Sequence, residues 1–290
     1  MTAEAGQLYI VSTPIGNMGD FSFRAVEVLK SVALILAEDT RHSRPLLDRY
    51  GITTSLSAYH EHNEAKTTAR FVERLLGGES LALISDAGTP LLSDPGQRLV
   101  SAAVAAGIRV LPIPGASALL AALVASGLPA DRFTYFGFLA RKGRERAEVL
   151  AEIASSRYTA VLYEAPLRVA DTLRELAELA GDREAVVARE LTKHFEEIRR
   201  GTLEALCAYY TDSPPRGEVV ILISGAPITA PDENALRDDA RALRAGGMSV
   251  RDVAAVLTGR GLARNAAYRL AKDAETTTGG TRRAEGDSDE

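Results

Sequence analysis

Cysteine is almost absent from the sequence, since its 290 residues contain a single one, Cys207. One cysteine excludes an internal disulfide and any metal cluster built on cysteine thiolates. Its apolar setting, TLEALCAYY, predicts a buried packing role rather than a nucleophile. Histidine is scarce as well, and although His60 and His62 in YHEHNE could ligate zinc, no cysteine lies near them in the sequence. We therefore expect no metal.

Long apolar runs are missing too. No run approaches the ~18 residues of a membrane span, and residues 1–6 lack the basic and apolar regions of a signal peptide. We expect a cytoplasmic protein with no membrane partner. The chain also has no G-x-x-x-x-G-K-S/T motif, which argues against a P-loop. A dehydrogenase stays open, because Glu38 and Asp39 lie about twenty residues beyond the first loop, where a dinucleotide fold places its ribose-binding acid.

The overall charge offers little to a nucleic acid. The formal net charge is −5, in a chain with 46% hydrophobic and 25% charged residues, which is an ordinary globular composition with room for two domains and an appendage. The charge is uneven along the chain, however. Between Arg237 and Asp273 eight Lys and Arg stand against four Asp, a local charge of +4.

The first half of the chain alternates short β-rich runs with amphipathic helical stretches, which predicts a mostly parallel sheet with crossover helices. Each predicted strand is followed by a loop of unusual composition. The strands are expected at 8–12, 33–37, 54–59, 81–85 and 109–113, and the loops are TPIGN (13–17), EDTRHS (38–43), HEHN (60–63), SDAGTP (85–90) and PGAS (114–117). Because ligands of open α/β sheets bind beyond the carboxyl ends of the strands, these loops indicate a single ligand site.

The glycines and prolines of these loops favour a ligand held by backbone groups, since glycine lets the backbone approach a ligand closely. In EDTRHS, an acid, a base and a cation stand together at a strand end, as a group-transfer site requires. The alternative is an exposed salt-bridge cluster in which Asp39 or Thr40 caps a helix that starts near Ser43.

The second half predicts another α/β domain that ends near Ser224. Its strands are expected in RFTYFGFL, YTAVLYEAP, AVVARELT and GEVVILISG, separated by helices at 144–155, 168–180 and 203–210. The charged segment ARELTKHFEEIRRG (188–201) faces either solvent or the cleft between the domains. Arg141, Lys142 and Arg144 form a basic patch of the kind that follows phosphates.

Beyond a proline-containing linker at 225–234, a small helical unit is expected. Helices at 250–258 and 262–274 flank a glycine turn, with Arg264 and Arg269 on the second helix, which resembles a helix-turn-helix; a solvated helical pair packed on the body is the alternative. Residues 275–290 contain few apolar side chains, and we expect them to be disordered. The predicted organisation is an N-terminal domain at 7–117, a second domain at 118–226, a helical unit at 232–274 and a tail.

Seven segments in order carry a family resemblance: YIVSTPIGN, AEDTRHSRPLL, YHEHNE, SDAGTPLLSDPG, PIPGASA, LYEAPLR and RELTKHFEEIRRG. Over residues 7–225 the chain resembles the bacterial 16S ribosomal RNA cytidine 2′-O-methyltransferases, in the RNA-modifying branch of the tetrapyrrole methylase superfamily. TPIGN stands where the superfamily commonly has a glycine-rich first loop. This difference matches the RNA-modifying branch.

The resemblance implies an α/β, two-domain, tetrapyrrole-methylase-like (class III methyltransferase) fold with a small C-terminal helical unit. It also implies a homodimer and S-adenosyl-L-methionine bound between the domains. The methyl group would pass to the ribose 2′-hydroxyl of a cytidine in the decoding region of 16S rRNA, within the 30S ribosomal subunit. The residues that would contact the cofactor are Pro14, Gly16, Ser85, Asp86, Ala87, Gly88 and Ser117.

A methyl transfer of this kind needs an aligned ribose oxygen and a group that takes its proton. The candidates for a base or orienting group are Glu38, Asp39 and His60, with Arg41 binding phosphate or fixing the carboxylates, and with Lys193 and Glu190 acting from the second domain. Two alternatives remain: a methyltransferase for a corrinoid (tetrapyrrole) precursor or a diphthamide intermediate, and a helix-turn-helix regulator whose α/β body senses a metabolite.

Overall fold

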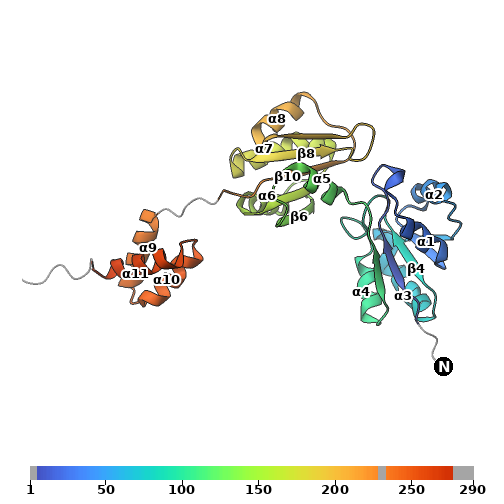
Figure 1. Ribbon diagram of the computed structural model, residues 1–290, viewed down its shortest axis with the longest axis horizontal. Helices are drawn as coiled ribbons and strands as arrows, with labels where there is room; N and C mark the ends of the chain where they lie inside the picture. The colour runs from blue at the N-terminus through green and yellow to red at the C-terminus, as the bar shows by residue number, and fades with distance from the viewer. Residues whose placement is uncertain (1–4, 228–232, 277–290) are drawn as a thin grey trace, which may run out of the picture. The chain divides into compact units, whose positions relative to one another are not determined.

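The structure, a computed structural model, describes residues 5–227 and 233–276 (Figure 1). The chain divides into two compact units, Met1–Ala226 and Pro227–Glu290. Within the described residues no helix is both long and apolar enough to cross a membrane.

The first sheet of the larger unit is wholly parallel, with the strand order β3-β2-β4-β1-β5. Its strands are β1 (Leu8–Val11), β2 (Leu34–Ala37), β3 (Leu56–Ala58), β4 (Leu81–Ile84) and β5 (Val110–Ile113). All five lie within the segments that the sequence predicts. The register pairs Val11 with Ile84 and with Ile113, and Ala37 with Ile84 and with Ala58, so the five strands end at one edge.

Helices cover both faces of this sheet because its central strands β2 and β4 are apolar and buried on both sides. Along β2, Ile35 packs with α1 (Phe23–Ser31) and α2 (Thr40–Arg49), whereas Leu34 and Leu36 pack with α3 (Glu61–Leu76) and α4 (Gln97–Ala105). Figure 1 shows the two helix pairs on opposite sides of β4. A short 3-10 helix, η1 (Met18–Asp20), follows β1.

The second sheet is mixed, with the order β6-β7-β10-β8-β9, and only β6 and β7 run parallel. Its strands are β6 (Phe133–Phe138), β7 (Thr159–Glu164), β8 (Glu184–Arg189), β9 (Glu197–Thr202) and β10 (Val219–Ile223). The sequence predicts four of these strands and misses β9. This edge strand carries Glu197, Arg199 and Arg200, a charge that is typical of a surface or cleft segment rather than of a strand.

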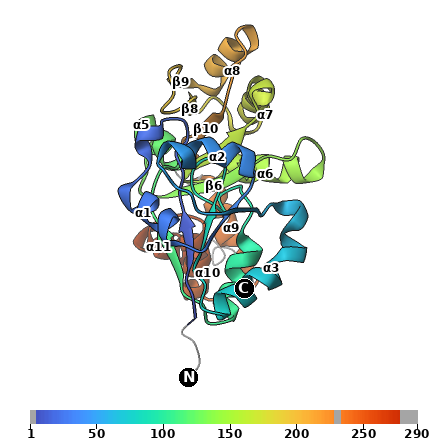
Figure 2. The ribbon, with the colours of Figure 1, turned by 90° about the vertical axis from the view of Figure 1, so that its right-hand side faces the viewer.

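One face of the second sheet is covered by α6 (Arg144–Ser155), α7 (Val169–Ala180) and α8 (Leu203–Asp212). The predicted helix 168–180 is shorter at its start, where Pro166–Arg168 form the 3-10 helix η2. Figure 2 shows α7 and α8 beside each other, to the right of β8 and β10.

The other face of the second sheet receives α5 (Ala118–Ser126) together with Ile15 from the first sheet's first loop. Ile15 and Leu119 therefore belong to the same apolar cluster as Val161 and Val220. The boundary that we predict at 117/118 falls at the start of α5; it stays a prediction, as do the other domain limits.

The smaller unit consists of α9 (Glu233–Ala245), α10 (Val250–Gly259) and α11 (Arg264–Thr276), packed around Leu236, Val253, Leu257 and Ala267. Ser249 caps α10, with its Oγ accepting from the Asp252 backbone N–H at 3.2 Å. Of the tail predicted at 275–290, residues 277–290 lie outside the described part of the chain.

Candidate active site

Hydrogen bonds tie together the loops at the carboxyl edge of the first sheet. The Thr13 N–H donates to the Gly88 carbonyl at 2.8 Å, and the Gly88 N–H donates to the Thr13 carbonyl at 3.1 Å. The Thr89 hydroxyl then donates to the Ala116 carbonyl at 3.1 Å and pairs with the Ser12 hydroxyl at 3.0 Å. The first, fourth and fifth loops thus form one rigid framework.

Backbone strain gathers in two loops. Four non-glycine residues in the described segments have φ in the left-handed region: Leu91 and Ser93 in SDAGTPLLSDPG, and Glu190 and Thr192 in RELTKH. Such conformations cost about 1–3 kcal/mol each and concentrate at functional sites. Each strained loop contacts the opposite sheet or its loops: the Ser93 hydroxyl meets the Tyr135 hydroxyl of the second sheet at 2.7 Å, and Thr192 Oγ1 accepts from the N–H of Asn17, in the first loop, at 3.1 Å.

A cavity of about 390 Å³ opens between the two sheets. Its first wall comes from the carboxyl edge of the parallel sheet and the start of α5, and its second from the end of β7 and the start of β10. The first wall includes Ile15, Glu38, Asp86, Ala87, Gly88, Asp94 and Ser117, and the second includes Tyr163, Glu164, Gly217, Glu218 and Val220. The volume lies within the ~300–1,000 Å³ typical of small-molecule sites.

Three carboxyl groups line the first wall, those of Glu38, Asp86 and Asp94. Burial, reinforced by the charge of Asp86, raises the pKa of Glu38 above its usual value. Burial and the charge of Glu38 raise the pKa of Asp94 to about 7, although the Ser85 hydroxyl acts in the opposite direction. Asp86 is also fixed in place, because its Oδ1 accepts from the Asp39 N–H at 3.1 Å.

Asp39 has a different environment from Glu38. It is the N-cap of α2, accepting from the Arg41 N–H at 2.8 Å, and its carboxylate also pairs with the Arg41 guanidinium at 2.8 Å. The Arg41 hydrogen bonds hold the pKa of Asp39 well below its usual range. Asp39 therefore caps a helix, as one of the two interpretations of EDTRHS predicts. The helix, α2, begins at Thr40 rather than near Ser43.

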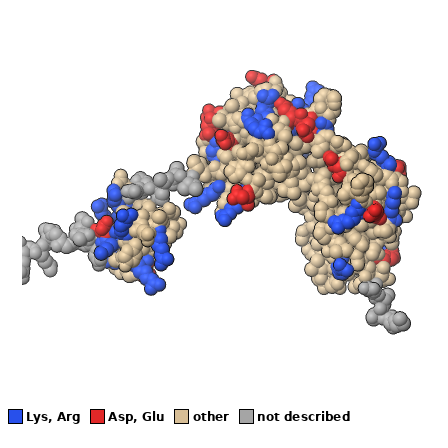
Figure 3. Space-filling view, in the orientation of Figure 1, with Lys and Arg blue, Asp and Glu red and all other residues tan. Residues whose placement is uncertain are grey.

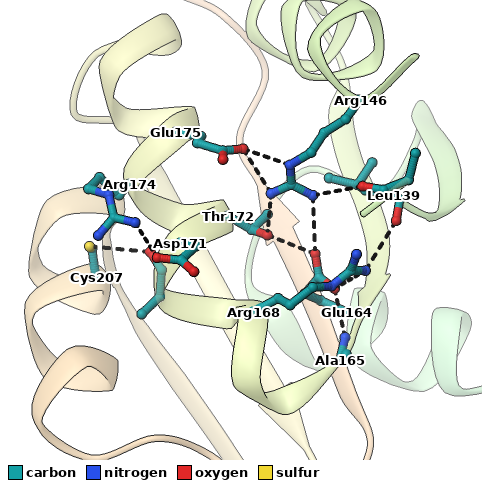
Figure 4. A network of polar contacts seen from close by, with 12 residues as sticks. Leu139, Arg146, Glu164, Ala165, Arg168, Asp171, Thr172, Arg174, Glu175 and Cys207 are labelled. Carbon is teal, nitrogen blue, oxygen red and sulfur yellow. Dashed lines mark hydrogen bonds and ion pairs between the residues drawn. The ribbon is translucent and has the colours of Figure 1, made fainter. Parts of the chain in front are cut away.

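Buried charges hold the second wall of the cavity (Figure 4). The side chain of Glu164, at the end of β7, is fully buried. Its carboxylate accepts from the Ala165 N–H, from Arg168 Nε and from the Thr172 hydroxyl, each at 2.7 Å. Arg146 closes the network by donating to Thr172 Oγ1 at 2.9 Å and to Glu175 at 2.8 Å.

The same network holds the loop before α6. Arg168 Nη2 donates to the Leu139 carbonyl at 3.1 Å, and Arg146 Nη1 donates to the Ala140 carbonyl at 3.2 Å. This loop continues into Arg141 and Lys142. The candidate RNA-contacting residues and the cavity wall are thus anchored by one set of buried charges.

A second cavity, of about 460 Å³, adjoins the first and shares Ile15, Asp86, Ala87 and Glu218 with it. At its rim Lys193 Nζ donates to Glu190 at 2.9 Å and to Glu218 at 3.1 Å. Burial would lower the pKa of Lys193, but these two hydrogen bonds outweigh it and the pKa is raised, so the side chain stays a cation.

The structure distributes the predicted site residues over both cavities. Glu38, Asp86, Ala87, Gly88 and Ser117 line the first, and Pro14, Gly16, Arg41, Ser85, Asp86, Ala87 and Lys193 line the second. Asp39 and His60 are not among the lining residues; His60 lies close enough to Glu38 to act on its charge. Arg141, Lys142 and Arg144 are exposed before and at the start of α6, and Arg264 and Arg269 are exposed on α11.

Sequence reasoning missed Asp94, Tyr163, Glu164 and Gly217 as lining residues. Asp94 lies in SDAGTPLLSDPG, a few residues after the SDAGTP loop. The other three lie near the end or the start of a strand, in YEAP and RGEVV. A polar or glycine residue at the end of a strand predicts a ligand-site residue in the first domain, and the same pattern would have identified these residues in the second.

The comparisons with known proteins agree on one family. The model of the Tetrapyrrole (Corrin/Porphyrin) Methylases matches residues 7–207. A Synechocystis protein named Ribosomal RNA small subunit methyltransferase I is 50% identical over 248 residues, 84% of this chain and 89% of that protein. Proteins of the same name are 53% identical in Xylella fastidiosa (76% and 82% covered) and 43% identical in Bacillus subtilis (80% and 79% covered).

Solved structures share the fold at low sequence identity. Diphthine synthase superposes with a TM-score of 0.60 at 16% identity, covering 76% of this chain and 90% of that one. Uroporphyrin-III-C-methyltransferase from Thermus thermophilus gives a TM-score of 0.52 at 20% identity, covering 76% and 93%. The predicted class III methyltransferase fold is confirmed.

Proposed function

The chain belongs to the Tetrapyrrole (Corrin/Porphyrin) Methylase family, and we propose that it transfers a methyl group from S-adenosyl-L-methionine to the ribose 2′-hydroxyl of a cytidine in the decoding region of 16S rRNA. The observation that carries this proposal is the acid-lined cavity between the two sheets, built from the motifs that the sequence analysis singled out. Relatives that are 50% and 53% identical in sequence carry the name Ribosomal RNA small subunit methyltransferase I, which supports ribosomal RNA as the methyl acceptor.

The residues of the first cavity fit this cofactor. S-adenosylmethionine carries a positive sulfonium and a positive amine, and the wall offers the carboxyl groups of Glu38, Asp86 and Asp94. Gly88 has φ +83°, and a Cβ there would lie 3.2 Å from Ile15 Cγ2, so the backbone leaves room that a side chain would fill. We propose that Asp86, Ala87, Gly88 and Ser117 hold the cofactor from this wall, with Pro14, Gly16 and Ser85 positioning the adjoining loops.

The second wall fits as well. Gly217 has φ +82°, and a Cβ there would lie 2.0 Å from Glu190 Oε1, so a side chain at this position would strain the backbone and displace Glu190. The Tyr163 hydroxyl accepts from the Leu119 N–H at 3.2 Å and fixes the start of α5 against β7. These contacts hold the cavity in shape before any ligand enters.

When bound, the cofactor supplies an electrophilic methyl group, so this chain's residues have to orient the acceptor oxygen and take up its proton. Glu38 and Asp94 are the best-placed proton acceptors, because they line the cavity and their raised pKa values bring them nearer to neutral pH. His60 acts on the charge of Glu38 rather than on the acceptor. Asp39 and Arg41 orient the loop, since their carboxylate and guanidinium are paired with each other.

We assign RNA contacts to two exposed basic groups. Arg141, Lys142 and Arg144 extend the loop that the Glu164 network anchors. Arg264 and Arg269 lie on α11 of the helical unit, whose visible surface carries many Lys and Arg side chains (Figure 3). Their partner would be phosphate, which gives binding a strong salt dependence.

The homodimer remains part of the proposal. The apolar helix α5 leaves Val124 77% and Leu120 49% exposed, and a second copy would cover such side chains. An acceptor within the ribosome would place the protein in the cytoplasm. Sedimentation at micromolar concentration tests the dimer directly.

The test of the function is a choice among acceptors. Two reactions are set up, each with the protein and methyl-labelled S-adenosylmethionine. One contains 30S subunits from a strain lacking the modification, and the other contains uroporphyrinogen III. Label in the RNA and none in the tetrapyrrole is expected. Label in the tetrapyrrole alone, or cofactor binding with no transfer to 30S subunits, refutes the proposal; binding without turnover is what a metabolite-sensing regulator would give.

A further inference from the structure

The second cavity has the build of a nucleotide site. Its buried apolar lining is formed by Ile15 and Leu46, and the cations Arg41 and Lys193 line it together with the carboxyl residues Asp86 and Glu218. Ile15 is 5% and Leu46 8% exposed, so the apolar lining offers a dry surface for the flat face of a base. Its volume of about 460 Å³ accommodates one nucleotide rather than a folded RNA segment.

The two cations equip the cavity for an anion. Arg41 uses Nε and Nη2 to bind Asp39, which fixes the direction of its guanidinium while its side chain stays 90% exposed. Lys193 also lines this cavity and is held by Glu190 and Glu218. Two positioned cations beside an apolar lining suit a phosphodiester linked to a nucleoside inside.

A buried hydroxyl without a partner marks the interior. Ser43 lines the cavity, is 3% exposed, and its Oγ has no hydrogen-bond partner within the described residues. A serine inside a helix commonly donates to the carbonyl four residues earlier. Here the Asp39 carbonyl accepts from the Ser43 N–H at 3.0 Å, and the hydroxyl makes no such bond. A buried polar group of this kind costs stability until a ligand atom satisfies it.

The shared wall relates the two cavities. Ile15, Asp86, Ala87 and Glu218 line both of them, so the two cavities adjoin at these residues and a group in the second lies beside the contents of the first. We propose that the second cavity binds the acceptor nucleotide, with its base against the apolar lining, Ser43 Oγ hydrogen-bonded to a polar atom of the nucleoside, and its phosphate bound by Arg41 and Lys193. This inference rests on the proposed function, and it names the residues that select the acceptor.

Binding can be measured apart from catalysis. Cytidine 3′-monophosphate and cytidine are titrated into the full chain saturated with S-adenosylhomocysteine, and heat is followed by calorimetry. Ser43→Ala should weaken both ligands by about 5- to 30-fold, the loss expected for one hydrogen bond. Lys193→Gln should weaken the monophosphate by a similar factor and leave cytidine unchanged.

The matched control is Ser155→Ala, which removes an exposed helix hydroxyl that donates to the Glu152 carbonyl at 3.1 Å. It should bind both ligands as the wild type does, and all three variants should bind S-adenosylhomocysteine normally. If neither ligand binds the wild type, or if Ser43→Ala matches Ser155→Ala, the assignment is overturned even where 30S subunits are methylated. If nucleotides bind as described but 30S subunits are not methylated, the proposed function fails and the nucleotide site stands.

Discussion

Replacing Glu164 by glutamine tests whether the buried charge network holds the cavity wall. The change keeps the size of the side chain and removes its charge. Glu164 accepts three hydrogen bonds at 2.7 Å, two of them from Ala165 and Thr172 and one from the guanidinium of Arg168. A glutamine amide can accept on one side only, and its NH₂ would face donors.

The magnitude follows from burial. Removing one partner of a buried ion pair costs about 3–5 kcal/mol, because the opposite charge stays buried without compensation. The side chain of Arg168 is 24% exposed, so water can partly solvate its guanidinium once the carboxylate is gone. We therefore expect Glu164→Gln to lower the free energy of unfolding by about 3 kcal/mol. The matched control is Glu148→Gln on α6, whose exposed pair with Arg144 contributes only about 0.3–0.5 kcal/mol.

The assay is urea denaturation followed by circular dichroism, with the slope of the transition compared between variants. Cofactor affinity is measured on the same samples at low urea. Glu164→Gln should bind S-adenosylhomocysteine more weakly than Glu148→Gln does, because Ala165 and Pro166 line the cavity. Equal unfolding free energies and equal affinities for the two variants would refute the structural role assigned to the network.

Three further changes probe the site. The pKa of Asp94 is raised to about 7, so the side chain can accept a proton only above that pH and the kcat/KM of the wild type should rise through pH 7. Asp94→Asn should abolish this rise and lower the rate at pH 8 about 100-fold. The control Asp212→Asn, at an exposed position, should keep both the rise and the rate. Gly16→Ala would place a Cβ 2.4 Å from Lys193 Cγ, and the displaced lysine should raise KM for 30S subunits about tenfold with cofactor affinity retained, as measured by initial rates and calorimetry. Arg264→Gln and Arg269→Gln should each reduce the slope of log K for RNA against log salt by about 1, measured by filter binding, whereas an unchanged slope would exclude these side chains from the RNA interface.

The first sheet could be predicted from the sequence because its strands are short and mostly apolar and are separated by strong loop signals. The strand ends then placed Glu38, Asp86 and Gly88 at one edge, and the structure brings all three to one cavity. Strand β9 could not be predicted in this way. Its side chains are stabilised by cross-strand pairs such as Arg189 with Glu197 at 2.6 Å, which exist only once β8 lies beside it.

The second wall was beyond sequence reasoning for a related reason. Tyr163 and Gly217 are more than fifty residues apart in the chain and meet only because β10 pairs with β7. The role of Asp39 could not be predicted from EDTRHS either, because this sequence is compatible with a free carboxylate at the site and with a helix cap, and the structure shows the cap. Local patterns predicted where the ligand-binding loops begin, and the tertiary pairing decided which side chains face the ligand.

The most direct test of the central claim is to map the methyl group. 16S rRNA from 30S subunits incubated with the protein and labelled S-adenosylmethionine is digested to fragments and nucleosides, and the products are identified by mass spectrometry. We predict one 2′-O-methylcytidine, located in the decoding region. A methyl group on a base, on another nucleoside, or spread over many positions would contradict the claim.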